Sequence, residues 1–152
     1  MNENMTKTCK LEKVNKLFSE GFSCSQSIMA AYARDFNLDE ETALRISSSF
    51  GGGIAGRKEL CGAVSAALMV LGMKYGRVEA KDVDSKNRNN LLANKFIDGF
   101  KELYGTYTCG ELLNTFQEEN KGTNKDTRQN CGGLLNNTVD ILEKLLNNQE
   151  VI

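Results

Sequence analysis

The sequence contains no histidine, no proline and no tryptophan among its 152 residues. Without histidine, the chain cannot build a Ser-His-Asp triad, a Cys-His nucleophile pair, a histidine-ligated zinc site or a histidine-ligated haem. Neither sign of charge is in excess, because the chain has 19 basic and 20 acidic residues and a net charge of -1. No basic patch of the kind that binds phosphate backbones stands out, so we expect no nucleic-acid partner.

Long apolar runs are also missing. The N-terminal stretch lacks the apolar segment of a secretory signal and reads MNENMTKTCKLEKVNK. The apolar run from Ala63 to Leu71 is too short to cross a bilayer and is typical of a buried helix. We therefore expect no membrane insertion and a cytoplasmic location. In such a chain, five cysteines favour metal binding or redox chemistry over a permanent disulfide framework.

Helical periodicity dominates the chain, and strand signals are nearly absent. The pattern predicts an all-α, single-domain bundle of about six to seven helices over residues 1–152. The most apolar of these helices, from about Lys58 to Tyr75, should lie at the centre with the others around it. Residues 1–9 are expected to be frayed, and the polar stretch 118–129 is expected to be a loop.

Two further helices are predicted from their apolar stripes. A long helix from Val83 to Tyr104 is expected to bury one such stripe, which consists of Leu92, Phe96, Phe100 and Leu103. The last helix is expected to begin at Cys131 and to end near Leu146.

Three cysteines stand where helices are expected to begin. Each follows a residue that commonly caps helices, in the pairs Ser23-Cys24, Thr108-Cys109 and Asn130-Cys131. In the first two pairs, Gln or Glu follows at the third helical position and completes a capping-box pattern. Because a helix N-terminus carries partial positive charge and free N–H groups, it stabilises a thiolate. We therefore expect these three thiols to be more acidic than ordinary cysteines.

Cys61 follows a glycine-rich segment instead of a cap. The glycines of this segment are Gly51, Gly52, Gly53 and Gly56. They formally match G-x-G-x-x-G, but no strand precedes them, so a dinucleotide site is not indicated. We interpret the segment as a loop whose backbone N–H groups are free to bond a sulfide, a thiolate or an anion. A flexible turn between helices is the alternative. Arg57 and Lys58 are expected to lower the pKa of Cys61.

The candidate site therefore consists of Cys24, Cys61, Cys109 and Cys131. Their spacing is wide and contains no Cys-x-x-Cys, which argues against a thioredoxin-like dithiol and against the bacterial ferredoxin motif. The fold must bring them together if they share chemistry. Otherwise each is a small buried hydrophobe, as free cysteines often are. Cys9 has no comparable cap and is left out of the site.

The order of these motifs resembles the C-GCAxxG-C-C family, which comprises small redox-active proteins of bacteria and archaea. The resemblance runs from about Lys10 to Leu146 and includes all four cysteines and the glycine segment. There is one departure, because the family's Gly-Cys-Ala-x-x-Gly reads here Leu60-Cys61-Gly62-Ala63-Val64-Ser65-Ala66. Split-Soret cytochromes c are similar to this family in a helical portion whose cysteines hold an iron–sulfur centre. The resemblance thus implies a redox role for the four cysteines.

Three functions are compatible with these residues. The first is electron transfer to a redox protein partner through an iron–sulfur cluster, whose negative charge converging helix N-termini would offset. The second is a thiol–disulfide or peroxide-type reductase that uses the cysteines in pairs and needs no metal. The third is a binding module with a structural zinc ion on four cysteines. No residue is assigned a catalytic role, enzymatic activity is left open, and a homodimer is compatible with all three.

Overall fold

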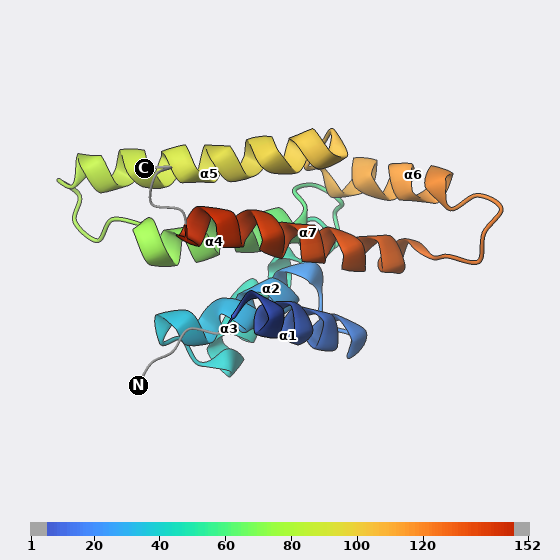
Figure 1. Ribbon diagram of the computed structural model, residues 1–152, viewed down its shortest axis with the longest axis horizontal. Coiled ribbons are helices and arrows are strands. Elements are labelled where there is room, and N and C mark those ends of the chain that lie inside the picture. Colours follow the sequence, from blue (N-terminus) through green and yellow to red (C-terminus); the bar gives the residue numbers. More distant parts are fainter. Residues whose placement is uncertain (1–5, 148–152) are drawn as a thin grey trace.

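The computed structural model describes residues 6–147, which form seven α-helices and two short 3₁₀ turns (Figure 1). The elements are α1 (Lys7–Ser19), α2 (Cys24–Ala33), η1 (Arg34–Phe36), α3 (Glu40–Ser47), η2 (Ser48–Phe50), α4 (Gly62–Tyr75), α5 (Val83–Tyr104), α6 (Cys109–Glu119) and α7 (Thr127–Asn147). The all-α prediction is confirmed. No helix in the described range combines the length and the apolar character that a membrane span needs.

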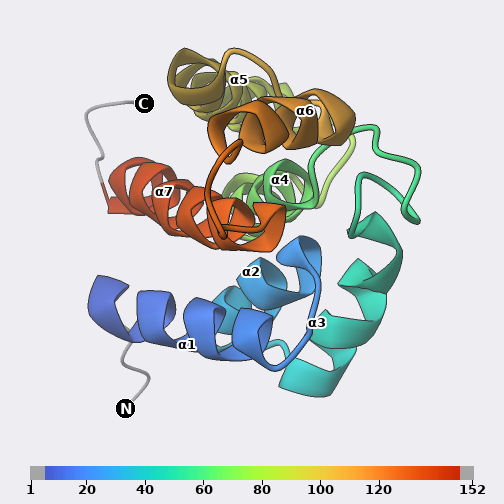
Figure 2. The same cartoon turned by 90° about the vertical axis from the view of Figure 1, so that its right-hand side faces the viewer.

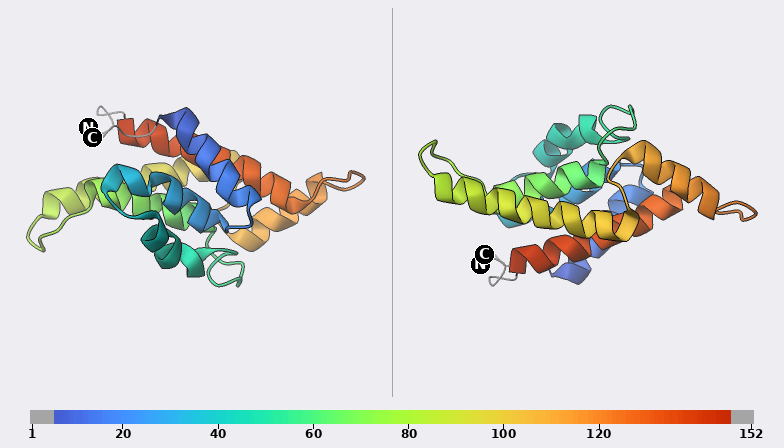
Figure 3. Two further views of the ribbon diagram at one scale, coloured as in Figure 1. Left: turned by 90° about the horizontal axis from the view of Figure 1, so that it is seen from below. Right: turned by 90° about the horizontal axis from the view of Figure 1, so that it is seen from above.

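The helices stack in three layers, with α1, α2 and α3 in one, α4 and α7 in the middle, and α5 and α6 in the third (Figures 1 and 2). α4 packs against α2, α5 and α7, and α5 runs lengthwise over α4 and α7 (Figure 3). The residues of α4 from Gly62 to Ala67 are all buried. The prediction of a central apolar helix is therefore confirmed, although the helix begins at Gly62 and not near Lys58.

The first and last helices differ from the prediction at their starts. Thr6 caps α1, so Cys9 lies inside a helix rather than in a frayed end, while residues 1–5 lie outside the described range. The last helix begins at Thr127, because Asp126 and Gln129 form a reciprocal cap. The Gln129 N–H donates to Asp126 Oδ1 at 3.0 Å, and the Asp126 N–H donates to Gln129 Oε1 at 3.1 Å. The loop predicted for 118–129 therefore spans only 120–126.

The long helix α5 buries the predicted stripe except at its last member. Leu92, Phe96 and Phe100 are fully buried, whereas Leu103 is 57% exposed, so that part of the prediction is wrong. Tyr104 takes the inward position instead. Its ring lies 5.0 Å from that of Phe100 and meets the ring of Phe116 edge-on at 6.4 Å.

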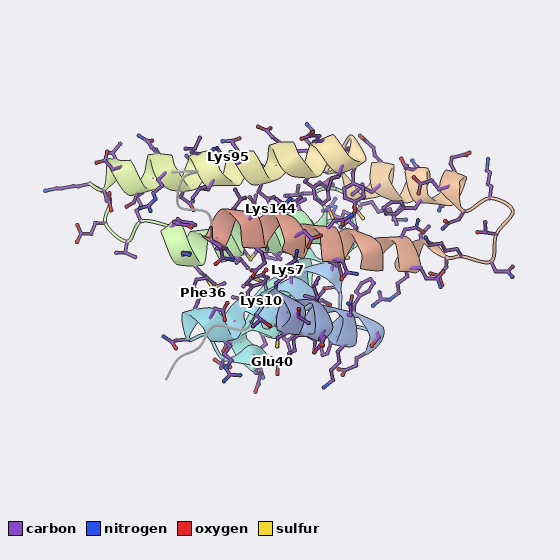
Figure 4. The ribbon with its side chains drawn as sticks, viewed as in Figure 1. Lys7, Lys10, Phe36, Glu40, Lys95 and Lys144 are labelled. Carbon is purple, nitrogen blue, oxygen red and sulfur yellow. The ribbon has the colours of Figure 1, made fainter. Side chains whose placement is uncertain are left out.

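A buried ion network joins the first layer to the middle layer. Lys10 Nζ lies 2.7 Å from an oxygen of Asp35 and 3.4 Å from one of Glu143. The Tyr32 hydroxyl donates to the same Glu143 oxygen at 2.9 Å. Lys10 thus lies on the side of α1 that faces α7, as does the more exposed Lys7 (Figure 4).

Candidate functional site

The four cysteines of the candidate site line one cavity of about 250 Å³, the cysteine cavity. Cys24, Cys109 and Cys131 come from α2, α6 and α7, and Cys61 immediately precedes α4. The rest of the wall is mainly apolar and includes Phe18, Leu112, Leu113, Phe116 and Leu134. All five cysteines are free thiols, and Cys9 is exposed on α1 outside this lining. The fold therefore brings together the four cysteines that the sequence singled out.

A short antiparallel pairing places Cys61 beside Cys109. Leu60 and Thr108 form an isolated bridge. On either side of it, the Cys61 N–H donates to the Tyr107 carbonyl at 2.9 Å, and the Cys109 N–H donates to the Glu59 carbonyl at 2.6 Å. Alternate residues of extended chains point to the same side, so the two cysteines share one side of the pairing and Leu60 and Thr108 the other. Nothing in the sequence pattern indicated this bridge.

Close backbone contacts bring Cys24 to the same place. The capping box predicted at the start of α2 is present, because Ser23 and Gln26 exchange side-chain and backbone hydrogen bonds. A Cβ on Gly51 would lie 2.4 Å from Ser23 Cβ, and one on Gly62 would lie 3.2 Å from the Ser25 nitrogen. Glycine at position 51 lets the segment after η2 approach the start of α2, and glycine at position 62 lets the first turn of α4 pack against the Phe50 carbonyl and the first turn of α2. By contrast, Thr108 forms no side-chain cap on α6, so that predicted capping box is wrong.

The glycine segment is a left-handed turn that covers one side of the cysteine cavity. Residues 52–56 all have positive φ, between 52° and 77°. Gly52 and Gly53 line the cavity, whereas Gly51 and Gly56 do not. The Gly56 N–H donates to the Gly51 carbonyl at 3.2 Å. The prediction that the N–H groups of this segment are free to bond a ligand is therefore wrong for Gly56. The turn thus contributes to the cavity through two of its four glycines.

The basic residues around the site are placed differently from the prediction. Burial raises the pKa of Cys109, and the charge of Lys58 only opposes this shift, whereas the pKa of Cys61 is raised by burial and not lowered by Arg57 or Lys58 as predicted. Arg57 is exposed and does not line the cavity. Arg128, which sequence analysis missed, does line it. Its guanidinium lies 3.7 Å from the ring centre of Phe18 and donates to the Phe22 carbonyl at 3.0 Å.

Arg128 stands one helical turn before Cys131 and was missed because the helix was expected to begin only at Cys131. A correct start at Thr127 makes this i, i+3 relation visible in the sequence. Arg128 contributes to lowering the pKa of Cys131.

The four thiols of the cysteine cavity differ in the direction of their pKa shifts. Hydrogen bonding between the side chains of Cys24 and Cys131 raises the pKa of Cys24, aided by burial, and lowers that of Cys131. Burial raises the pKa of Cys61 to about 11, although the N–H groups of Ala63 and Val64 point at its sulfur and oppose the shift. Burial also raises the pKa of Cys109.

The prediction of acidic thiols is therefore wrong for Cys24 and Cys109. Loss of hydration and the hydrogen bond to Cys131 outweigh any favourable effect of the helix start. The pKa of Cys131 is lowered as predicted, but Cys131 is the fifth residue of α7 and owes this to its neighbours.

We expect alkylation of the reduced, metal-free protein to separate the cysteines by pH. A lowered pKa gives Cys131 more thiolate at neutral pH, so its reaction with iodoacetamide should reach its midpoint at the lowest pH of the four. Cys61 should require pH values approaching 11, because its raised pKa keeps it protonated below that. Peptide mapping by mass spectrometry across a pH series measures each midpoint, with exposed Cys9 as internal reference. Equal midpoints for Cys61 and Cys131 would contradict this electrostatic picture.

The arrangement does not form a ready site for one metal ion. Within residues 6–147, no group of three or more His, Cys, Asp or Glu side chains is positioned to hold a single ion. What the cavity offers is four thiols on its wall, one hydrogen-bonded pair among them, and two inward-pointing N–H groups at Cys61.

Comparison with known proteins places the chain in a family. A search of curated proteins and a search of solved structures give no match. A family model described as "Putative redox-active protein (C_GCAxxG_C_C)" matches residues 22–145, which include all four cavity cysteines and the glycine turn. The chain therefore belongs to the C_GCAxxG_C_C family of redox-active proteins.

Proposed function

We propose that the protein transfers single electrons through an iron–sulfur cluster bound in the cysteine cavity by Cys24, Cys61, Cys109 and Cys131. The observation that carries this proposal is that four thiols from four helical segments line one cavity with otherwise mainly apolar walls. Four cysteine thiolates are the ordinary ligand set of such clusters. The cluster would supply one-electron chemistry, and the partner would be another redox protein.

The surroundings of the thiols fit a negatively charged group larger than one ion. Ligands of a cluster bind different iron atoms, so they need not converge on one point as zinc ligands do. The two N–H groups at Cys61 and the charges of Arg128 and Lys58 would offset thiolate charge. Apolar walls keep water away, and hydrogen bonds and solvent exposure set the reduction potential of such centres. The zinc alternative has no comparable support.

A second candidate rests on the hydrogen bond between Cys24 and Cys131. Two adjacent thiols, one of them with a lowered pKa, are the arrangement from which a disulfide forms. Oxidation would join the two sulfurs, release the two thiol protons and pass two electrons to a disulfide or peroxide substrate. The protein would then be a reductase rather than an electron carrier.

Metal and sulfide content decides between the candidates. Protein purified without oxygen should be brown and contain iron and acid-labile sulfide. The Cys61→Ser variant should lose most of both, while the Cys9→Ser variant should keep them, because Cys9 lies outside the cavity lining. Colourless wild-type protein whose mild oxidation links Cys24 to Cys131 would favour the reductase. Zinc without sulfide would contradict both.

A further inference from the structure

A second cavity, of about 310 Å³, is lined by the C-terminal end of α5, by α6, by Lys125 of the loop 120–126 and by α7. It shares part of its wall with the cysteine cavity, because Leu112, Phe116 and Leu134 line both. The exposed Leu103 belongs to its lining. This volume falls in the range of small-molecule sites, which occur between the helices of bundles.

One pair of aromatic side chains connects the two cavities. Tyr104 lines the second cavity and meets Phe116 edge-on at 6.4 Å. Phe116 in turn lines the cysteine cavity. A molecule in the second cavity would therefore be separated from the cysteines by a single layer of side chains.

The polar groups of this second cavity include several hydrogen-bond donors. The Tyr104 oxygen accepts from Asn137 Nδ2 at 2.7 Å, and the hydroxyl proton finds no acceptor within residues 6–147. Asn130 uses its oxygen to accept from Asn120 at 2.7 Å, which leaves its amide N–H groups as donors. Lys125 adds an ammonium group, and Glu119 is the single carboxylate of the lining.

These features define the class of ligand. A wall that combines leucine and phenylalanine side chains with several donors suits a flat, uncharged molecule that carries carbonyl oxygens. One lysine balanced by one glutamate offers little to a phosphate, which disfavours flavin and nicotinamide nucleotides. Quinones have the required combination of a planar apolar ring and two carbonyl acceptors. In the reduced form, a hydroxyl group would find an acceptor in Glu119.

We propose that the cavity between α5, α6 and α7 binds a small quinone. This quinone exchanges electrons across Phe116 with the redox centre that the four cysteines form. This inference rests on the proposed function. A hydroquinone becomes a quinone by breaking two O–H bonds, releasing two protons to water and giving up two electrons. If the protein holds an iron–sulfur cluster, two protein molecules each accept one of these electrons. If the protein instead holds a disulfide, one protein molecule accepts both electrons. Its S–S bond then breaks, and two S–H bonds form with two protons from water.

Binding is tested with duroquinone, whose four methyl groups prevent addition of thiols to the ring. Saturation-transfer NMR and equilibrium dialysis measure its affinity for the full-length protein. Gly133 lines the cavity, and a Cβ there would meet no atom within 4 Å, so Gly133→Leu adds a side chain to the cavity wall at a point where its first carbon meets no clash. We expect this variant to bind at least about tenfold more weakly. Tyr104→Phe keeps the ring, removes the donor and should weaken binding about two- to tenfold.

The matched control is Gly72→Leu on α4, where an added Cβ also meets no atom within 4 Å and which lies outside this lining. It should bind duroquinone like the wild type. Absence of saturable binding, or equal binding by Gly133→Leu and wild type, would overturn the proposal. If circular dichroism shows Gly133→Leu to be unfolded, the comparison of Tyr104→Phe with wild type decides instead.

Electron exchange is a separate measurement. Reduced duroquinone should reduce the oxidised wild-type protein, and Gly133→Leu should slow this at least about tenfold. Iron and sulfide in a protein that binds no quinone would refute the quinone site and leave the proposed function standing. The opposite outcome is also possible: the protein binds quinone in a way that depends on Gly133, but contains neither a cluster nor a reactive cysteine pair. This result would refute the proposed redox function and the electron exchange, but it would leave the quinone site standing.

Discussion

Replacement of Lys10 by methionine should destabilise the protein by about 3–5 kcal/mol. The Lys10 residue is only 4% exposed, and its ammonium group lies between the carboxylates of Asp35 and Glu143. Methionine fills a similar volume but leaves these two buried carboxylates without the ammonium between them. The Tyr32 hydroxyl bonds to one of them, so the disturbance reaches the core of α2. The free energy of unfolding, measured by urea denaturation, gives the effect directly.

Lys7 provides a matched control on the same two helices. It pairs with Asp140 at 2.6 Å, but both side chains are about half exposed, at 50% and 43%. An exposed pair of this kind contributes at most about 1 kcal/mol, because water screens the charges. Lys7→Met should therefore change the unfolding free energy far less than Lys10→Met. Similar losses from the two variants would show that burial of the Lys10 network does not strengthen its effect.

Helix boundaries were predictable where local signals agree. Val83 and Tyr104 bound α5 as expected, because Asp82 accepts from the Ser85 N–H at one end and Gly105 adopts a φ of 75° at the other. The start of α7 was missed although Asp126 and Gln129 form an equally local cap. That cap lies in a polar stretch whose composition indicated a loop.

The grouping of the cysteines could be proposed from the sequence, but the contacts that produce it could not. Cys61 and Cys109 are neighbours because of the Leu60–Thr108 bridge, which forms between segments far apart in the chain and carries no strand pattern. The acidity of the thiols depends on burial and on the contact between Cys24 and Cys131, which no helix-start pattern contains. Only the tertiary structure supplies these effects, and here they reverse the prediction for Cys24.

Substitution of Gly53 by alanine should destabilise the protein by about 2–5 kcal/mol and disrupt the cysteine cavity. Gly53 has a φ of 72°, where an L-residue is disfavoured by about 1–2 kcal/mol. In addition, a Cβ would lie 2.5 Å from the Glu59 nitrogen and 2.7 Å from Cys109 Cβ. Relief of these overlaps must move either the paired segment that holds Cys61 or the start of α6, which adds about 1–3 kcal/mol.

Gly56→Ala separates the conformational effect from the steric one. Gly56 lies in the same turn with a φ of 77°, but an added Cβ there meets no atom within 4 Å. It should cost only the backbone contribution of about 1–2 kcal/mol and, if the proposed cluster is bound, leave iron and sulfide content unchanged. Gly53→Ala should lower both contents as well as the unfolding free energy. If Gly56→Ala is as damaging as Gly53→Ala, the left-handed backbone alone sets the requirement for glycine, and the close approach to Cys109 does not help to position the site.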